Sequence, residues 1–137
     1  MTEPQIIALV VDDSEVVRSF VAHVLEGCGC LVFTATNGEE AVRLAAKGFA
    51  QLVMMDLYMP LMDGWAAAKE IRKIEQQRGK RRCFMVAMSS APNRESCMAA
   101  GMNDVLEKPV TSDMLHKIMD EIRSAEQPGQ EHKVRAE

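Results

Sequence analysis

The stretch VMMDLYMPLMDG, residues 53–64, decides the fold because an apolar run ends in one carboxylate and passes directly into a loop. An uninterrupted apolar run is typical of a parallel strand that is buried on both faces. Asp56 is therefore expected at the carboxyl end of such a strand, and Pro60 and Gly64 mark the loop that follows it. Ligands bind at this edge of open α/β sheets, which makes Asp56 a candidate site residue.

The same pattern, an apolar run followed by a polar residue, recurs three more times. Asp12 and Asp13 follow residues 6–11, Ser89 follows residues 85–88, and Lys108-Pro109 follows Val105 and Leu106. Because the carboxyl ends of parallel strands share one edge of a sheet, these side chains are predicted to meet. The sequence thus predicts one site containing Asp12, Asp13, Asp56, Ser89 and Lys108.

Strand-like and helix-like segments alternate along the chain. Strands are predicted at 6–11, 31–36, 51–56, 83–88 and 104–107, and helices at the segment ending with Gly27 and at 39–47, 64–77, 93–100 and 111–124. Five such alternations predict an α/β fold, a doubly wound parallel sheet with helices on both faces. Right-handed crossovers leave few strand orders, and the flavodoxin-like order 2-1-3-4-5 places the first and third strands side by side.

The length of 137 residues predicts one domain, with 47% hydrophobic residues for its core. We assign residues 1–124 to this domain and 125–137 to a flexible C-terminal tail, since apolar periodicity ends there and Pro128-Gly129 follows. The net charge of −4 argues against a nucleic-acid partner. Seven Lys or Arg residues lie between positions 69 and 82, which predicts a solvated helix end and loop or, alternatively, a docking surface.

Cysteine usage and hydropathy predict a cytoplasmic protein without membrane insertion. Cys28, Cys30, Cys83 and Cys97 have no paired zinc-ligand spacing, so buried or idle thiols are expected rather than a metal or redox site. The chain shows no signal peptide and no apolar run near 18 residues in length.

Carboxylates that converge at one strand edge repel each other unless a cation neutralises them. Oxygen ligands without His or Cys favour magnesium. Asp13 and Asp56 are predicted to bind it directly, Asp12 through water or a second contact, and a backbone carbonyl near Tyr58 to complete the set. A structural calcium site or a helix-capping cluster is the alternative, but it leaves Ser89 and Lys108 unexplained.

Lys108 and Ser89 suit phosphoryl chemistry. An ammonium opposite magnesium forms a two-sided clamp for a phosphoryl group, and a serine hydroxyl can serve one of its oxygens. Asp56 can then act as the nucleophile and form an aspartyl phosphate.

Over residues 5–124 the chain resembles the receiver domain of two-component response regulators. The matching motifs are VDDS at 11–14, MDLYMPLMDG at 55–64, AMSSA at 87–91 and EKP at 107–109. The resemblance implies that Asp56 takes a phosphoryl group from a phosphohistidine of a sensor histidine kinase or a histidine-phosphotransfer protein. It also implies that Asp12 and Asp13 hold Mg²⁺, that Ser89 and Lys108 bind the phosphoryl oxygens, and that the chain is no enzyme beyond its own phosphotransfer and dephosphorylation.

One position departs from the family pattern. Receivers commonly carry Tyr or Phe three residues before the lysine, and here that position is Val105. A short side chain that is stiff at χ1 cannot make the inward swing of a ring. We therefore expect any switch to run through Ser89 and residues 90–94, which favours a relay carrier; its downstream effector is not identified by the sequence.

Two other functions compete with the receiver. A magnesium-dependent phosphohydrolase with an aspartate nucleophile carries a second Asp two residues further on, but here Tyr58 occupies that position and is a poor acid–base group at neutral pH. A degenerate receiver used only for binding would lack part of the acceptor set, which is complete here.

Overall fold

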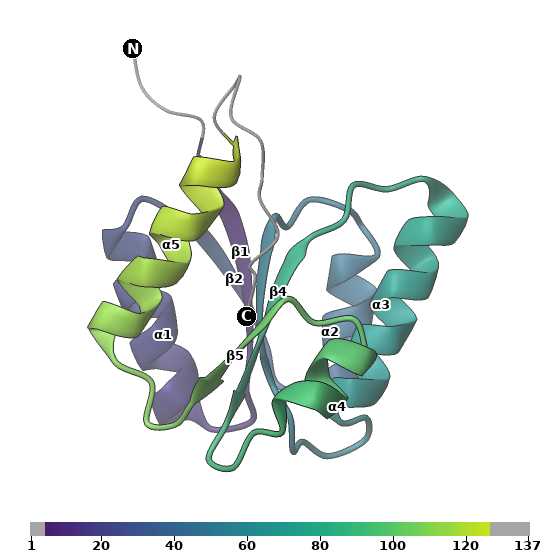
Figure 1. The fold of residues 1–137 in the computed structure, drawn as a ribbon, viewed down its shortest axis with the longest axis horizontal. Coiled ribbons are helices and arrows are strands. Elements are labelled where there is room, and N and C mark those ends of the chain that lie inside the picture. Colours follow the sequence, from purple (N-terminus) through teal and green to yellow (C-terminus); the bar gives the residue numbers. More distant parts are fainter. Residues whose placement is uncertain (1–4, 127–137) are drawn as a thin grey trace.

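The computed structural model describes residues 5–126 as a parallel sheet of five strands with helices on both faces (Figure 1). The strand order is β2-β1-β3-β4-β5, which confirms the predicted doubly wound, flavodoxin-like topology. The strands are β1 (Ile7–Val11), β2 (Leu31–Ala35), β3 (Leu52–Asp56), β4 (Phe84–Ser89) and β5 (Asp104–Glu107).

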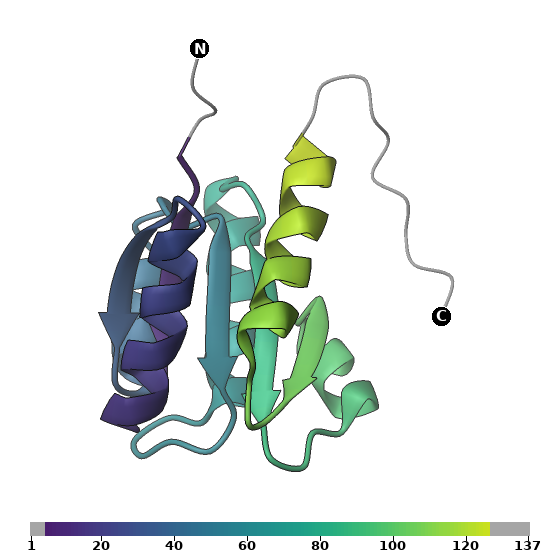
Figure 2. The same ribbon diagram turned by 90° about the vertical axis from the view of Figure 1, so that its left-hand side faces the viewer.

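Helices α1 and α5 lie together on one face of the sheet, and α2, α3 and α4 lie on the other (Figures 1 and 2). The helices are α1 (Glu15–Gly27), α2 (Gly38–Ala45), α3 (Gly64–Arg78), α4 (Arg94–Ala99) and α5 (Ser112–Glu126). Helix α5 continues through residues 125 and 126, which we had assigned to the tail. The rest of that predicted tail, 127–137, lies outside the described residues.

Strand β3 is apolar without interruption because it contributes to two cores. Val53 and Met55 face the core beneath α2, α3 and α4, whereas Leu52 and Met54 face the core beneath α1 and α5. All four side chains are fully buried. This two-sided burial fixes the register of β3 and holds its last residue, Asp56, at the carboxyl edge of the sheet.

Side-chain caps fix where the helices begin, and one of them bears on the site. Ser14 accepts a hydrogen bond from Val17 N and is the N-cap of α1. An aspartate can be an N-cap as well as a serine, and Asp13 directly precedes Ser14. Since Ser14 fills this role, the exposed carboxylate of Asp13 is not used as a cap.

At two places on the helices, the burial of side chains differs from what their apolar or charged character suggests. Phe20 belongs to the apolar stripe of α1, yet it is 42% exposed. On α3 the apolar residue Ile74 is only half-buried, while its charged neighbour Glu75 is buried. Among the described residues no helix is long and apolar enough to cross a membrane.

The amino edge of the sheet buries a charged pair. Arg72 Nη1 lies 2.8 Å from Glu75 Oε1, and the two side chains are only 10% and 11% exposed. Arg72 also donates to Gly101 O and to Asn103 Oδ1, while Glu75 Oε2 accepts from Cys83 N. The basic residues of the segment 69–82 are exposed apart from Arg72, which is part of a structural network.

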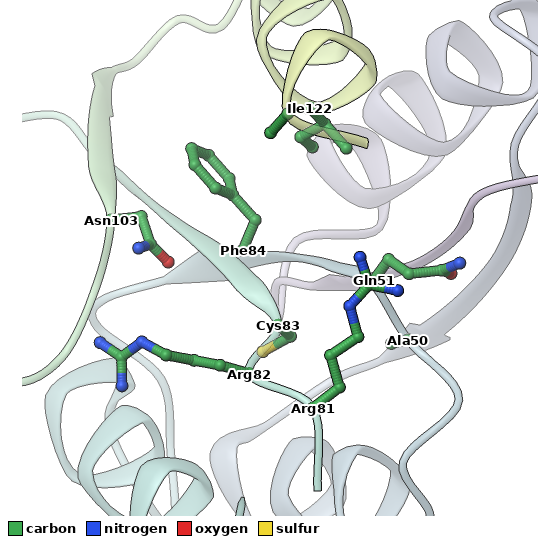
Figure 3. Close-up of a pocket in the computed structure, with 9 residues that line it drawn as sticks. Ala50, Gln51, Arg81, Arg82, Cys83, Phe84, Asn103 and Ile122 are labelled. Carbon is green, nitrogen blue, oxygen red and sulfur yellow. The ribbon is translucent and has the colours of Figure 1, made fainter. Parts of the chain in front are cut away.

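Next to this network lies a pocket of about 280 Å³ (Figure 3). The ring of Phe84 and the sulfur of Cys83 lie between two arginines of the α3–β4 loop and Ile122 of α5. Since the pocket surrounds the first residues of β4, it lies at the edge of the sheet opposite Asp56.

Candidate functional site

Three carboxylates meet at the carboxyl edge of the sheet. Ligand oxygens of Asp12, Asp13 and Asp56 all lie within 4.8 Å of one another. The strand pairing explains the convergence, because Val11 of β1 is opposite Met55 of β3 and each is followed by an aspartate. Asp12 is fully buried, Asp56 is 5% exposed and Asp13 is exposed.

Lys108 is the cation that faces these carboxylates. Its Nζ lies 3.0 Å from Asp12 Oδ2 and donates a hydrogen bond of 3.2 Å to Asp56 Oδ1. The lysine is held at the end of β5, where its backbone N–H donates to Ser89 O at 2.8 Å. The peptide bond between Lys108 and Pro109 is cis.

Ser89 completes the predicted set at the end of β4. Asp56 pairs in register with Met88, so Ser89 lies one residue beyond Asp56 along the neighbouring strand. Its side chain is buried, and its Oγ accepts a hydrogen bond from Ala91 N at 3.2 Å. The hydroxyl therefore also orients the first turn of the β4–α4 loop.

Burial and repulsion shape the titration of the site. Burial raises the pKa of Asp56 above its ordinary value, and the charge of Asp12 raises it further, while Lys108 opposes both. Burial disfavours the charge on Lys108, but its attraction to Asp12 and Asp56 outweighs burial and raises the pKa of the lysine. At neutral pH Lys108 therefore carries a positive charge, which offsets only part of the negative charge of the neighbouring carboxylates.

The geometry fits a divalent cation. Asp12 Oδ2 is buried, and the approach of Lys108 lies outside hydrogen-bond angles, so this oxygen has no hydrogen-bond partner among the described residues. The ammonium of Lys108 approaches this oxygen at 3.0 Å, but its single positive charge is shared among three carboxylates, and a divalent cation would relieve their remaining repulsion. Within residues 5–126 this is also the one cluster of three or more Asp, Glu, His or Cys residues able to hold a metal ion, and its oxygen ligands suit magnesium.

Several residues that support the site were not predicted. Arg18 of α1 donates from Nη1 to the backbone oxygen of Asp12 at 2.8 Å and fixes the β1–α1 turn. A Cβ on Gly64 would collide with Asp56 O, and a Cβ on Gly38 would collide with Met62 O. Close backbone approach around the Asp56 loop therefore requires glycine at both positions.

The loop after Asp56 carries exposed apolar side chains. Tyr58 is 64% exposed and Leu61 is 74% exposed. Leu61 adopts φ 71°, and Met62 N donates to Pro60 O across it. A left-handed leucine is strained, so the surrounding contacts must impose this conformation.

Val105 lies on β5, half-buried, and packs against the core beneath α2, α3 and α4. No ring occupies this position. At the position where other receivers carry an aromatic residue, this chain thus has an ordinary packed valine.

The four cysteines take no part in the site. All are free thiols, and three of them are buried. Burial raises the pKa of Cys30 to about 11 and that of Cys83 to about 12, so both remain protonated at neutral pH. Protonated, buried thiols make poor nucleophiles and metal ligands.

A five-stranded doubly wound sheet with an acidic cluster and a lysine at its carboxyl edge defines a class of phosphoryl-handling signalling domains, and comparison with known proteins identifies the family. The model for the response regulator receiver domain matches residues 8–120. The chain belongs to this family, which confirms the resemblance inferred from its motifs.

Individual relatives agree with this assignment. Hybrid signal transduction histidine kinase B of Dictyostelium discoideum is 34% identical over 119 residues, which covers 78% of this chain but only 6% of that kinase. The receiver domain of the Saccharomyces cerevisiae response regulator Ssk1, solved with the histidine phosphotransfer protein Ypd1, is 30% identical with a TM-score of 0.81 and coverage of 88% and 90% of the two chains.

A third relative was solved with a metal. The receiver domain of sensor histidine kinase PA1611 from Pseudomonas aeruginosa is 32% identical, with a TM-score of 0.77 and coverage of 88% of this chain and 100% of that one. That structure holds a magnesium ion in its active-site cleft. The chain described here is thus a receiver domain, and it spans only a small part of the hybrid kinase that it resembles.

Proposed function

We propose that Asp56 is the phosphoacceptor of this receiver and that it takes the phosphoryl group from a phosphohistidine. The observation that carries the proposal is the hydrogen bond of Lys108 to Asp56 inside a cluster of three carboxylates. In the transfer, a carboxylate oxygen of Asp56 forms a bond to phosphorus while the phosphorus–nitrogen bond breaks. The imidazole nitrogen of the donor keeps that electron pair.

Each neighbouring residue has a role in this step. Asp56 must be ionised to attack, and Lys108 favours its ionised form against the burial that raises its pKa. The ammonium of Lys108 and the hydroxyl of Ser89 then bind oxygens of the transferred group. Asp12, Asp13, Asp56 and the backbone carbonyl of Tyr58 are the proposed ligands of Mg²⁺, which when bound supplies positive charge opposite Lys108.

The proposed partner is a sensor histidine kinase or a histidine-phosphotransfer protein. The Ssk1 receiver was solved together with the phosphotransfer protein Ypd1, and the Dictyostelium relative is a hybrid histidine kinase. Both support a phosphohistidine donor for this chain. We place the protein in the cytoplasm, which its four free thiols support.

We infer further that the chain does not turn over a separate substrate. An aspartate-nucleophile phosphohydrolase needs a second carboxylate two residues after the nucleophile, and Tyr58 takes that position. The ring of Tyr58 lies against Trp65 at a centroid distance of 5.2 Å, in place of an acid–base group beside Asp56.

Labelling with a small phosphodonor such as acetyl phosphate tests the proposal. Intact mass spectrometry is expected to detect one added phosphate in the wild type with magnesium and none after chelation. Peptide mapping should locate it on Asp56, and Asp56→Asn should abolish it. Asp63→Asn is the matched control, since Asp63 only caps α3. Full labelling of Asp56→Asn, or unchanged labelling in chelator, would overturn the proposal.

A further inference from the structure

Trp65, the sole tryptophan, contacts both the β3–α3 loop and helix α4. It lies in the first turn of α3, and its ring makes an edge-type contact with the ring of Tyr58 in the β3–α3 loop at an interplanar angle of 78°. Its indole Nε1 donates a hydrogen bond of 3.2 Å to Ser96 Oγ in α4. Trp65 packs half-buried against the core, but core packing alone does not account for this hydrogen bond.

Ser96 carries the link to the end of the β4–α4 loop. Its Oγ donates to Asn93 O at 3.0 Å, and its backbone N–H donates to Asn93 Oδ1 at 2.9 Å. The other end of that loop is tied to the site, because Ala91 N donates to Ser89 Oγ. Residues 89–96 therefore run from the phosphoryl site to the indole of Trp65.

The contacts of Trp65 lie where coupling between Asp56 and α4 has to pass. Coupling between Asp56 and α4 needs an element with two arrangements that the phosphoryl group can bias. Val105 is short and packed and cannot provide two arrangements. The bond between Trp65 and Ser96 can be made or broken, because the exposed Ser96 hydroxyl can bond to water when α4 moves.

We propose that Trp65 is a positioning residue that holds α4 to the β3–α3 loop while Asp56 is unmodified. The inference rests on the proposed function. When Ser89 follows the phosphoryl group, the β4–α4 loop moves with it, Ser96 leaves the indole, and α4 is released. Trp65 thereby takes the part that the ring at position 105 has in other receivers.

The hydrogen bond sets the size of the effect. A solvent-accessible hydrogen bond contributes about 0.5–1.5 kcal/mol net, which is a two- to tenfold change in the balance of the two arrangements. Removing the bond favours the released arrangement. The modified site, or a mimic of it, should then bind about two- to tenfold more tightly.

Amide NMR with magnesium and beryllofluoride, a mimic of the phosphoryl group, tests the inference. A single tryptophan gives a single indole N–H signal, so its assignment is unambiguous. We expect the indole signal and the amide signals of Ser96 to move together with that of Ser89. A Ser89 shift with a stationary indole would overturn this inference and leave the proposed function intact. If Ser89 also stays in place, both fail.

Two variants sharpen the test. In Ser96→Ala the indole signal should move toward its beryllofluoride-bound position even without the mimic. The beryllofluoride concentration at the midpoint of the titration should fall about two- to tenfold. Trp65→Phe keeps a ring beside Tyr58 and should lower that midpoint to a similar degree. Ser124→Ala, an exposed helical serine on α5, is the matched control and should change neither. Wild-type midpoints in both Ser96→Ala and Trp65→Phe would contradict the proposal.

Discussion

The two edges of the sheet both bury charge, and they treat it in opposite ways. At the amino edge, Arg72 and Glu75 form a 2.8 Å ion pair, and each also bonds to backbone groups of neighbouring loops. At the carboxyl edge, three carboxylates share one lysine, and Asp12 Oδ2 has no hydrogen bond within the described chain.

This difference in pairing distinguishes charged groups that stabilise the fold from charged groups that form a binding site. A buried polar network that is fully satisfied adds rigidity and specificity. A buried cluster that is left short of cations stores repulsion, which a bound metal ion can relieve. Substitutions at the amino edge should therefore lower stability whether or not a metal is present. Substitutions at the carboxyl edge should change stability in a way that depends on the metal, and should change phosphorylation.

The largest expected effect is on the amino edge. Glu75→Ala leaves Arg72 and the N–H of Cys83 without their carboxylate, and breaking a buried pair costs about 3–5 kcal/mol. Urea unfolding should show this loss equally with and without magnesium. Glu70→Ala, on the same helix, is the control and should stay within about 0.5 kcal/mol. A loss for Glu75→Ala no greater than this would show that the network is not structural.

A smaller effect is expected from Lys108→Ala. The half-buried lysine stabilises the metal-free protein at neutral pH, since its pKa is raised by Asp12 and Asp56. That stabilisation is full below its ordinary pKa of 10.5 and is lost as pH rises through the higher folded value. In chelator we expect a loss of about 1–2 kcal/mol, reduced from the buried-pair range because solvent screens the ammonium.

Magnesium should restore much of the stability of Lys108→Ala, while phosphorylation of Asp56 remains weak. Thermal unfolding with and without the metal, together with intact mass after phosphodonor treatment, checks both points. Normal labelling of Lys108→Ala would contradict the role proposed for the ammonium.

The smallest effect concerns the strained loop between Asp56 and helix α3. Leu61 has φ 71°, and a left-handed L-residue costs about 1–2 kcal/mol, which Leu61→Gly removes. Glycine has more backbone freedom in the unfolded chain, however, and this entropy destabilises the folded protein by about 0.5–1 kcal/mol. The net expectation is a gain of about 0–1.5 kcal/mol in the free energy of urea unfolding. A marked loss would show that the exposed leucine side chain contributes packing that its 74% exposure does not suggest.

The sequence predicted most of this fold because local and global signals agree. Apolar runs that are buried on both faces identify β1, β3 and β4, and the polar residues after them locate the carboxyl edge. The predicted side chains Asp12, Asp13, Asp56 and Lys108 do meet there. Their roles in phosphotransfer remain predictions.

What the sequence could not give depends on long-range contacts. Glu75 reads as a surface position on a charged helix, and its burial is explained by its bonds to Arg72 on the same helix and to Cys83 N just before β4. Phe20 reads as a core residue by spacing, but α1 turns it outward. The indole of Trp65 meets Ser96 across 31 positions, and no local pattern signals that pairing.

The most direct test of the account compares the thermal unfolding of the wild type and Asp56→Asn at neutral pH, with magnesium and in chelator. The raised pKa of Asp56 means that its ionised form destabilises the metal-free fold, and this cost appears as pH rises through the folded value. We predict that Asp56→Asn melts above the wild type in chelator and that magnesium raises the wild type more than the variant. Asp13→Asn, which removes an exposed carboxylate, should change the chelated protein less. If the wild type is the more stable protein in chelator, then Asp56 is a structural charge like Glu75, and the account of the carboxyl edge is wrong.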